Sequence, residues 1–167
     1  PFDRLVSAYN NKVLELEDVT GPMHAMGLRH DMPFAEFLQR VVETPDEQMD
    51  VHLLPQASML CVDGQLIPSF VGQMEQMAMH WKALQVWLRR ERLPELGSIP
   101  SKNVRRGDDR DDLRQLFSDP GLVRLVEDRY ADDLSTFYPT RSIQELISGE
   151  SLSACPPQEP FVPSTSS

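Results

Sequence analysis

The sequence predicts a mainly helical globular domain, and three features of the chain support this prediction. Of its 167 residues, 40% are hydrophobic and 25% are charged, which is typical of a globular protein that buries a core. Apolar residues recur at steps of three and four over several long stretches. Only one short stretch looks like paired strands, around Asp63-Gly64, because this dipeptide favours a tight hairpin turn.

The predicted elements are bounded by proline and glycine. Each predicted helix carries one apolar stripe. The helices cover residues 2–16, 34–44, 70–92 and 120–137. Asp119 is expected to cap the last helix, with Pro120 in its first turn. Short strands are expected at residues 59–62 and 66–67. The domain is expected to span residues 1–140, and the Pro- and Ser-rich residues 141–167 are expected to form a disordered tail.

Charge and cysteine content exclude several classes of protein. A net charge of −10 disfavours non-specific binding to nucleic acid or to an anionic membrane. No apolar run approaches the ~20 residues of a membrane-spanning helix. Cys61 and Cys155 lack metal-ligand spacing and are expected to be unpaired thiols, with a single disulfide as the alternative. Because the chain begins at Pro1 and not at methionine, we expect a fragment or a processed product.

The first predicted helix carries a polar group near its start. Arg4, Ser7 and Asn11 lie on one side of the helix, where backbone N–H groups and the helix dipole favour anions. A solvated helix face is the alternative. The basic cluster that includes Lys102 and Arg105 suits closure over phosphates, although the aspartates that follow it could simply neutralise it.

The segment Pro1–Tyr9 closely resembles the segment of carbohydrate-type, family 2 sulfotransferases that binds the 3′-phosphate of 3′-phosphoadenosine 5′-phosphosulfate (PAPS). In that family a Pro-aromatic pair opens a helix, and a serine one to two turns later binds the phosphate. Ser7 matches this serine. Arg4 matches a recurrent position, and both a phosphate contact and pairing with a core carboxylate remain open for it. The arginine that precedes the proline in the family would fall before Pro1.

Five further segments resemble family motifs in the family's order. They are Phe34-Ala35-Glu36-Phe37-Leu38, His52-Leu53-Leu54-Pro55-Gln56, Phe70-Val71-Gly72-Gln73-Met74-Glu75, Lys102-Asn103 and the run from Leu125 to Leu134. Arg105 stands where the family usually has a serine after that asparagine. Six motifs in order over residues 1–138 make chance unlikely, so the chain is identified as a member of this family.

The resemblance implies a fold and an activity. The fold would be α/β, like that of P-loop nucleotide kinases around a parallel sheet, with this chain supplying the mainly helical C-terminal part. The activity would be transfer of a sulfuryl group from PAPS to a hydroxyl of a carbohydrate. The alternative is a non-catalytic helical interaction domain or a degenerate sulfotransferase remnant. Relatives imply the cytoplasm for a bacterial protein and the Golgi membrane for a eukaryotic one.

The chain lacks a Gly-x-x-x-x-Gly-Lys pattern. The family's lysine-bearing loop for the phosphosulfate would therefore lie N-terminal to these residues, and the isolated chain is expected to be inactive. Sulfuryl transfer resembles phosphoryl transfer, in which a protein mainly positions reactants and neutralises charge. The expected cofactor ligands are Ser7, Arg4, Lys102 and Arg105, and no metal is needed.

A hydroxyl acceptor also needs a base, which is usually His or Glu. We expect His52 to serve, because it lies in a matched motif, and a structural histidine that holds a loop is the alternative. Glu75 is expected either to orient a reactant or to cap or pair within the core. His24 and His30 are expected to be exposed, and His80 to be solvated on the polar face of the long helix.

Overall fold

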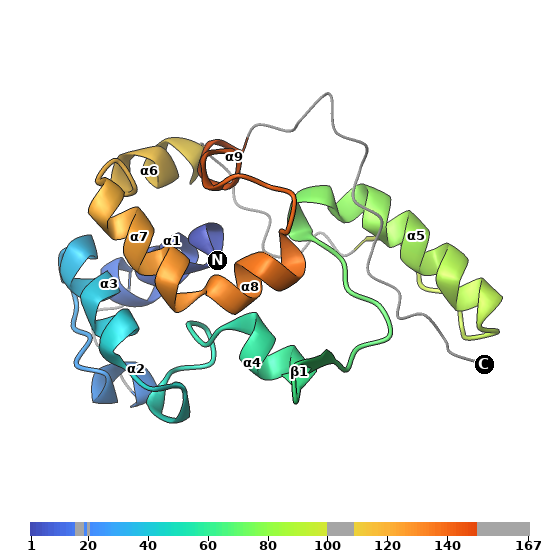
Figure 1. Cartoon of the computed structure of the whole chain (residues 1–167), viewed down its shortest axis with the longest axis horizontal. Coiled ribbons are helices and arrows are strands. Elements are labelled where there is room, and N and C mark those ends of the chain that lie inside the picture. Colours follow the sequence, from blue (N-terminus) through green and yellow to red (C-terminus); the bar gives the residue numbers. More distant parts are fainter. Residues whose placement is uncertain (16–18, 20, 100–108, 150–167) are drawn as a thin grey trace. The chain divides into compact units, whose positions relative to one another are not determined.

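The computed structural model describes residues 1–15, 19, 21–99 and 109–149. The chain divides into two compact units, which we describe one at a time. Of the described residues, those up to 65 and those from 109 to 149 belong to the first unit, and residues 66–99 belong to the second. Figure 1 shows the elements of both. Among the residues that are described, no helix is long and apolar enough to cross a membrane.

Helices build the first unit (Figure 1). They are α1 (Phe2–Ala8), α2 (Gly21–Ala25), α3 (Phe34–Glu43), α4 (Gln56–Leu60), α6 (Asp109–Leu116), α7 (Pro120–Arg129), α8 (Ala131–Phe137) and α9 (Ile143–Ser148). A π-helix, η1 (Tyr9–Leu14), continues α1, and a 3-10 turn, η2 (Asp46–Gln48), follows α3. Helix α3 packs against α7, and α1 packs against α6 and α9. These contacts enclose a single core.

An aromatic cluster fills that core where the first two predicted helices meet. The ring of Phe2 lies edge-on to Phe117 at 4.9 Å, and Phe34 lies edge-on to both Phe117 and Tyr9 at 5.2 and 5.1 Å. Edge-to-face pairs add roughly 0.5–1.5 kcal/mol beyond the area that they bury. The predicted apolar stripes of these helices are therefore confirmed, and they meet each other.

The first predicted helix changes its winding halfway. After α1, the π-helix η1 carries the chain to Leu14, and the N–H of the next residue, Glu15, donates to the carbonyl of Asn10 at 3.0 Å. Single π-turns inside helices are often found at functional sites. Tyr9 opens this segment, and its buried hydroxyl donates to the carbonyl of Met32 at 2.8 Å. Burial and then the charge of Asp31 raise the Tyr9 pKa.

The predicted hairpin is present, although its strands are shorter than expected. Strands β1 (Cys61–Val62) and β2 (Gln65–Leu66) form a two-stranded sheet. Asp63 and Gly64 between them have φ of 50° and 74°, as a tight primed turn requires. Met59 and Leu60 belong to α4 instead of a strand. The parallel sheet of an α/β fold is not found among the described residues.

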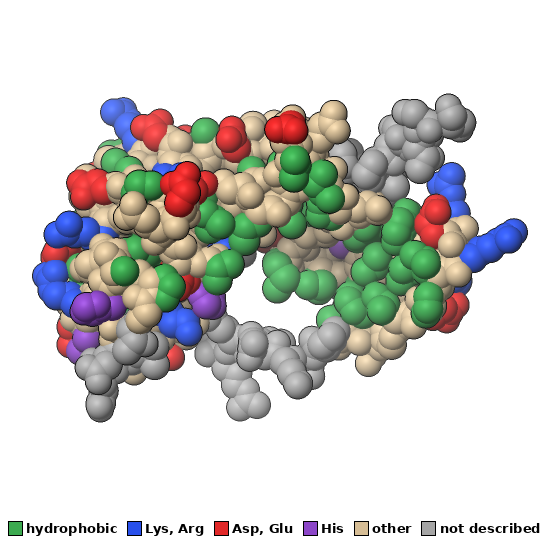
Figure 2. All heavy atoms as spheres, turned by 90° about the horizontal axis from the view of Figure 1, so that it is seen from below, with side chains coloured by type: hydrophobic (Ala, Val, Ile, Leu, Met, Phe, Trp, Pro, Cys, Tyr) green, Lys and Arg blue, Asp and Glu red, His purple; other side chains and the backbone are tan. Residues whose placement is uncertain are grey.

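The long helix of the second unit begins later than predicted. A 3-10 turn, η3 (Met74–Gln76), leads into α5 (Met77–Arg90). Phe70 and Val71 precede both, because the chain at Gln73 is extended and its N–H donates to the ring of His80 at 2.7 Å. Met74 falls within the predicted helix of residues 70–92 and was expected to lie on its apolar stripe, but this expectation is wrong, since 76% of the residue is exposed. Figure 2 shows hydrophobic side chains gathered on the α5 side of the view.

The predicted boundary at residue 140 is too early. Helix α9 follows it, and a capping box holds its start: Ser142 and Glu145 each accept from the other's backbone N–H. Leu146 and Ile147 then join the core of the first unit. Residues 141–149 are thus part of the folded unit, whereas residues 150–167 of the predicted tail lie outside the described residues.

The last predicted helix is divided in two. The predicted cap is confirmed, because the carboxylate of Asp119 accepts from the N–H of Gly121 at 2.7 Å and Pro120 opens α7. At Tyr130 the backbone leaves helical geometry, with φ of −113° and ψ of 28°. Helix α8 then runs in a different direction from α7. Tyr130 at this bend and Asp133 just after it contact the loop described next.

Candidate functional site

The candidate site is built around the segment between η2 and α4, which we call the His52 loop (residues 50–57). It contains the His-x-x-Pro-Gln motif and ends in the first turn of α4. Three side chains that are distant in sequence hold its backbone. They are Arg4, Tyr130 and Asp133.

Arg4 joins α1 to the His52 loop. Its two terminal nitrogens donate to the carbonyls of Leu54 and Val51, each at 2.6 Å. Hydrogen bonds from a charged donor are about twice as strong as neutral ones. These partners are main-chain carbonyls and not a core carboxylate, and a contact of Arg4 with the cofactor phosphate stays a prediction. Arg4 therefore positions the loop on both sides of His52.

Tyr130 holds the middle of the same loop. Its hydroxyl donates to the carbonyl of Leu53 at 2.6 Å, and only 2% of the residue is exposed. Burial raises the Tyr130 pKa well above its ordinary value, because ionisation would place a charge in the core. The tyrosine of the closing motif thus reaches the histidine motif across 77 positions of sequence.

Asp133 caps the helix that ends the loop. Its two oxygens accept from the N–H groups of Gln56 and Ala57, at 2.9 and 2.6 Å, and 1% of the residue is exposed. Pro55, the residue before α4, offers no side-chain cap. A carboxylate from a distant helix therefore satisfies backbone donors that α4 would otherwise leave unpaired. Sequence reasoning missed this role of Asp133.

Stability at alkaline pH is expected to depend on Tyr130. Because burial raises its folded pKa above the value of 10.0 in an exposed tyrosine, its contribution is complete below about pH 10 and is lost as the pH rises towards the folded pKa. Above pH 10 the free energy of unfolding should fall by about 1.4 kcal/mol per pH unit for this residue. Urea unfolding of the wild type and Tyr130→Phe at several alkaline pH values measures this slope. Equal slopes for both proteins would contradict the assignment.

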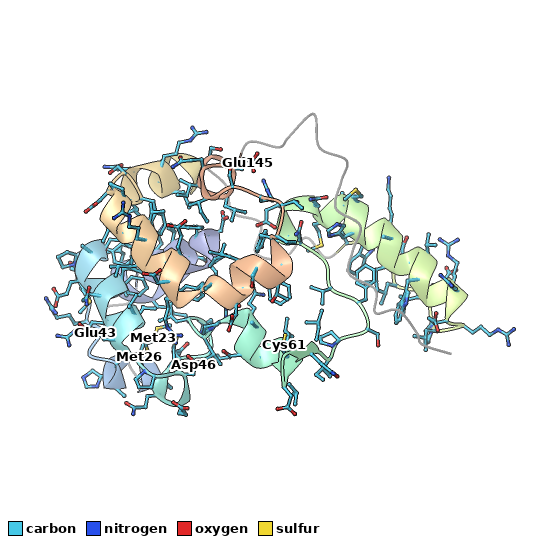
Figure 3. The ribbon with its side chains drawn as sticks, viewed as in Figure 1. Met23, Met26, Glu43, Asp46, Cys61 and Glu145 are labelled. Atoms are coloured by element: carbon cyan, nitrogen blue, oxygen red, sulfur yellow. The ribbon has the colours of Figure 1, made fainter. Side chains whose placement is uncertain are left out.

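A second cluster joins η2, which precedes the His52 loop, to α4, which follows it. Arg129 donates to the carboxylate of Asp46, and Ser58 donates to the other oxygen of that carboxylate at 2.6 Å. Burial opposes ionisation of Asp46, but the bonds from Ser58 and Arg129 outweigh it and hold the pKa below its ordinary value. Figure 3 labels both Asp46 and Glu43, the last residue of α3.

His52 itself is oriented by a carboxylate within the loop. One oxygen of Asp50 accepts the main-chain N–H of His52 at 2.9 Å and lies 2.7 Å from its ring Nδ1. The side chain of His52 is 56% exposed, whereas that of Asp50 is 13% exposed. The imidazole is therefore anchored at one nitrogen while most of the ring faces solvent.

Ser7 lies one helical turn after Arg4. Its side chain is half-buried, and its hydroxyl accepts from the amide of Asn11 at 3.4 Å. Since Arg4 contacts Val51 and Leu54, the helix that carries Ser7 is tied directly to the His52 loop. The structure thus joins the motif of the first helix to the histidine motif.

A groove of about 510 Å³ is formed by α2, the C-terminal half of α3 and η2, and the residues that line it do not include any of the His52 loop. Its polar lining includes Arg40, Glu43 and Gln48, and Met26 contributes an apolar wall. Figure 3 labels Met26 close to Glu43. The sulfur of Met26 also accepts from the N–H of Asp50 at 3.4 Å, so one residue contacts both the groove and the loop.

The remaining predicted site residues fall elsewhere. Lys102 and Arg105 lie outside the described residues, and Glu75 is exposed. His24 and His30 are exposed, as expected. In the part of the chain that the structure describes, no group of His, Cys, Asp and Glu could hold a metal ion.

The prediction that His80 is solvated is wrong. The residue is 3% exposed and is held in the second unit. Its Nδ1 accepts from the N–H of Gln73, and a Cβ on Gly72 would lie only 3.3 Å from the Cβ of His80. The Phe-Val-Gly motif therefore packs closely against this histidine. This close packing explains why residue 72 is a glycine, since a side chain there would crowd His80.

Comparison with known proteins places the chain in one family. The family described as "Sulfotransferase family" matches residues 1–139. The matched range contains α1, the His52 loop, α7 and α8, and hence every residue that holds the loop. No curated protein and no solved structure matches the chain.

Proposed function

Since the chain belongs to the sulfotransferase family, we propose that it takes part in the transfer of a sulfuryl group from PAPS to a hydroxyl of a carbohydrate. The observation that carries this proposal is the pair of bonds from Arg4 to the His52 loop. These bonds connect the helix of Ser7 to the loop of His52, which supports a site where a bound donor and an acceptor would meet.

We propose further that the chain supplies the mainly helical C-terminal part of an α/β fold like that of P-loop nucleotide kinases. The helical composition of the described residues is compatible with this division. In this proposal the parallel sheet and the lysine-bearing loop are contributed by other residues of the protein. The loop would neutralise charge on the transferred group.

The donor is assigned to the face of α1 that carries Ser7. A half-buried hydroxyl beside the Asn11 amide suits a phosphate oxygen, because both side chains can donate hydrogen bonds. When bound, the donor supplies the sulfuryl group, and its phosphate leaves with the electron pair of the broken bond. Lys102 and Arg105 remain proposed ligands of the donor's phosphates.

The acceptor is assigned to the groove that Met26 connects to the His52 loop. A guanidinium, a carboxylate and an amide line it beside an apolar wall, and this mixture suits a ligand with several hydroxyl groups. Its volume of about 510 Å³ lies within the range of roughly 300–1,000 Å³ of small-molecule sites. His52 is proposed as the base that takes the proton of the reacting hydroxyl.

Replacing Ser7 by alanine is expected to weaken binding of 3′-phosphoadenosine 5′-phosphate, the donor without its sulfuryl group. Loss of one hydrogen bond to a charged phosphate should cost roughly 1–3 kcal/mol of binding free energy. Calorimetric titration of this nucleotide into the full-length protein measures the effect.

Ser118→Ala is the matched control, because the Ser118 hydroxyl donates to the carbonyl of Gln115 at the end of α6. It should leave the affinity unchanged. Absence of binding by the folded wild-type protein would overturn the donor assignment and favour an interaction domain. Equal affinities for the wild type and Ser7→Ala would remove Ser7 from the site.

A further inference from the structure

We propose that Asp50 is the positioning residue that holds His52 in one tautomer, with Nδ1 protonated and Nε2 as the basic nitrogen. The use of this nitrogen in sulfuryl transfer rests on the proposed function. The tautomer itself is a property of the folded chain and can be measured without any activity.

The assignment of the tautomer follows from the chemistry of the pair. An ionised carboxylate only accepts hydrogen bonds. The Asp50 oxygen lies 2.7 Å from Nδ1 of His52, so Nδ1 must carry the hydrogen. A neutral imidazole has one protonated nitrogen, and the lone pair therefore belongs to Nε2.

Asp50 is itself held from several directions. Its carbonyl accepts from the N–H groups of Leu53 and Leu54 at 2.9 and 3.0 Å, and its own N–H donates to the sulfur of Met26 at 3.4 Å. Arg4 binds the carbonyls on both sides of His52. The carboxylate is thus fixed relative to the loop, and the ring bound to it has little freedom to turn over.

This arrangement leaves Nε2 of His52 as the nitrogen that can accept a proton. The side chain of His52 is 56% exposed, while Asp50 occupies Nδ1 on one edge of the ring. Nε2 lies on the opposite edge of an imidazole. A proton leaving an acceptor hydroxyl would pass to Nε2, and the negative charge of Asp50 would stabilise the resulting imidazolium.

The ¹⁵N spectrum of the neutral imidazoles tests the proposal, because protonated and unprotonated ring nitrogens have well-separated shifts. The wild-type chain should show His52 with Nδ1 protonated. His80 provides a contrast in the same spectrum, since its Nδ1 accepts from Gln73 and its Nε2 must carry the hydrogen. His52→Gln identifies the His52 signals by their loss.

Two variants distinguish the effect of the Asp50 hydrogen-bond acceptor from a general effect of substitution on the fold. Asp50→Ala should abolish the preference for the Nδ1-protonated form. Asp50→Asn should retain it, because the asparagine oxygen can still accept from Nδ1. Asp128→Ala, at an exposed position in α7, should change nothing.

Each outcome bears directly on the proposal. A wild-type His52 with Nε2 protonated would overturn it without any variant, and so would an unchanged tautomer in a folded Asp50→Ala. The expected spectra together with an inactive full-length protein would leave the pair in place and refute the proposed function instead.

Discussion

Replacement of Asp133 by alanine is expected to lower the free energy of unfolding by about 3–5 kcal/mol. The carboxylate is 1% exposed and accepts from two backbone N–H groups of α4. Each hydrogen bond to a charged group contributes about 1.5–3 kcal/mol, and the donors left behind would be buried without partners. Such a loss is at the upper end of what single substitutions do.

Urea unfolding at neutral pH measures this change as a lower midpoint at an unchanged slope. Asp132→Ala is the matched control, because the neighbouring aspartate is exposed in the same first turn of α8. It should shift the stability by no more than about 0.5 kcal/mol. Equal effects of the two substitutions would mean that α4 does not depend on the distant cap.

Local signals in the sequence predicted much of the secondary structure. The helix expected at 34–44 is present as α3 and ends one residue earlier, at Glu43, because Pro33 and Pro45 limit an apolar stripe that faces one core. Asp119 and Asp63-Gly64 likewise determine a cap and a turn through their own backbone geometry. These features depend on residues that are near one another in the chain.

The errors arise where a contact crosses sequence distance or breaks a period. Phe70 and Val71 continue the apolar stripe of α5, yet the bond from Gln73 to His80 keeps them outside the helix. The same bond buries a histidine that the helical period places on a polar face. Tyr130 fits one continuous stripe, but its bond to Leu53 coincides with the bend between α7 and α8.

The candidate site was predicted only in part for the same reason. The family motifs drew attention to Ser7, Arg4 and His52, but periodicity cannot show that Arg4 binds the loop of His52. Asp50 had one available signal, since an aspartate two residues before a histidine can accept from its backbone. That signal is weak in sequence alone, because the contact between Asp50 and His52 depends on a loop conformation that distant side chains hold.

The second large effect is expected in catalysis. In the full-length protein assayed with PAPS and a carbohydrate acceptor, His52→Ala should lower kcat by about 100- to 10,000-fold, the usual contribution of a general base. Affinity for 3′-phosphoadenosine 5′-phosphate should stay unchanged, because Ser7 and not His52 is assigned to that phosphate. Stability should also change little, since the ring is 56% exposed and its anchor Asp50 remains bonded through its backbone.

His24→Ala is the control, because His24 is another exposed histidine on α2. A variant that unfolds more easily but turns over substrate at the wild-type rate would show that His52 holds the loop and does not move the proton.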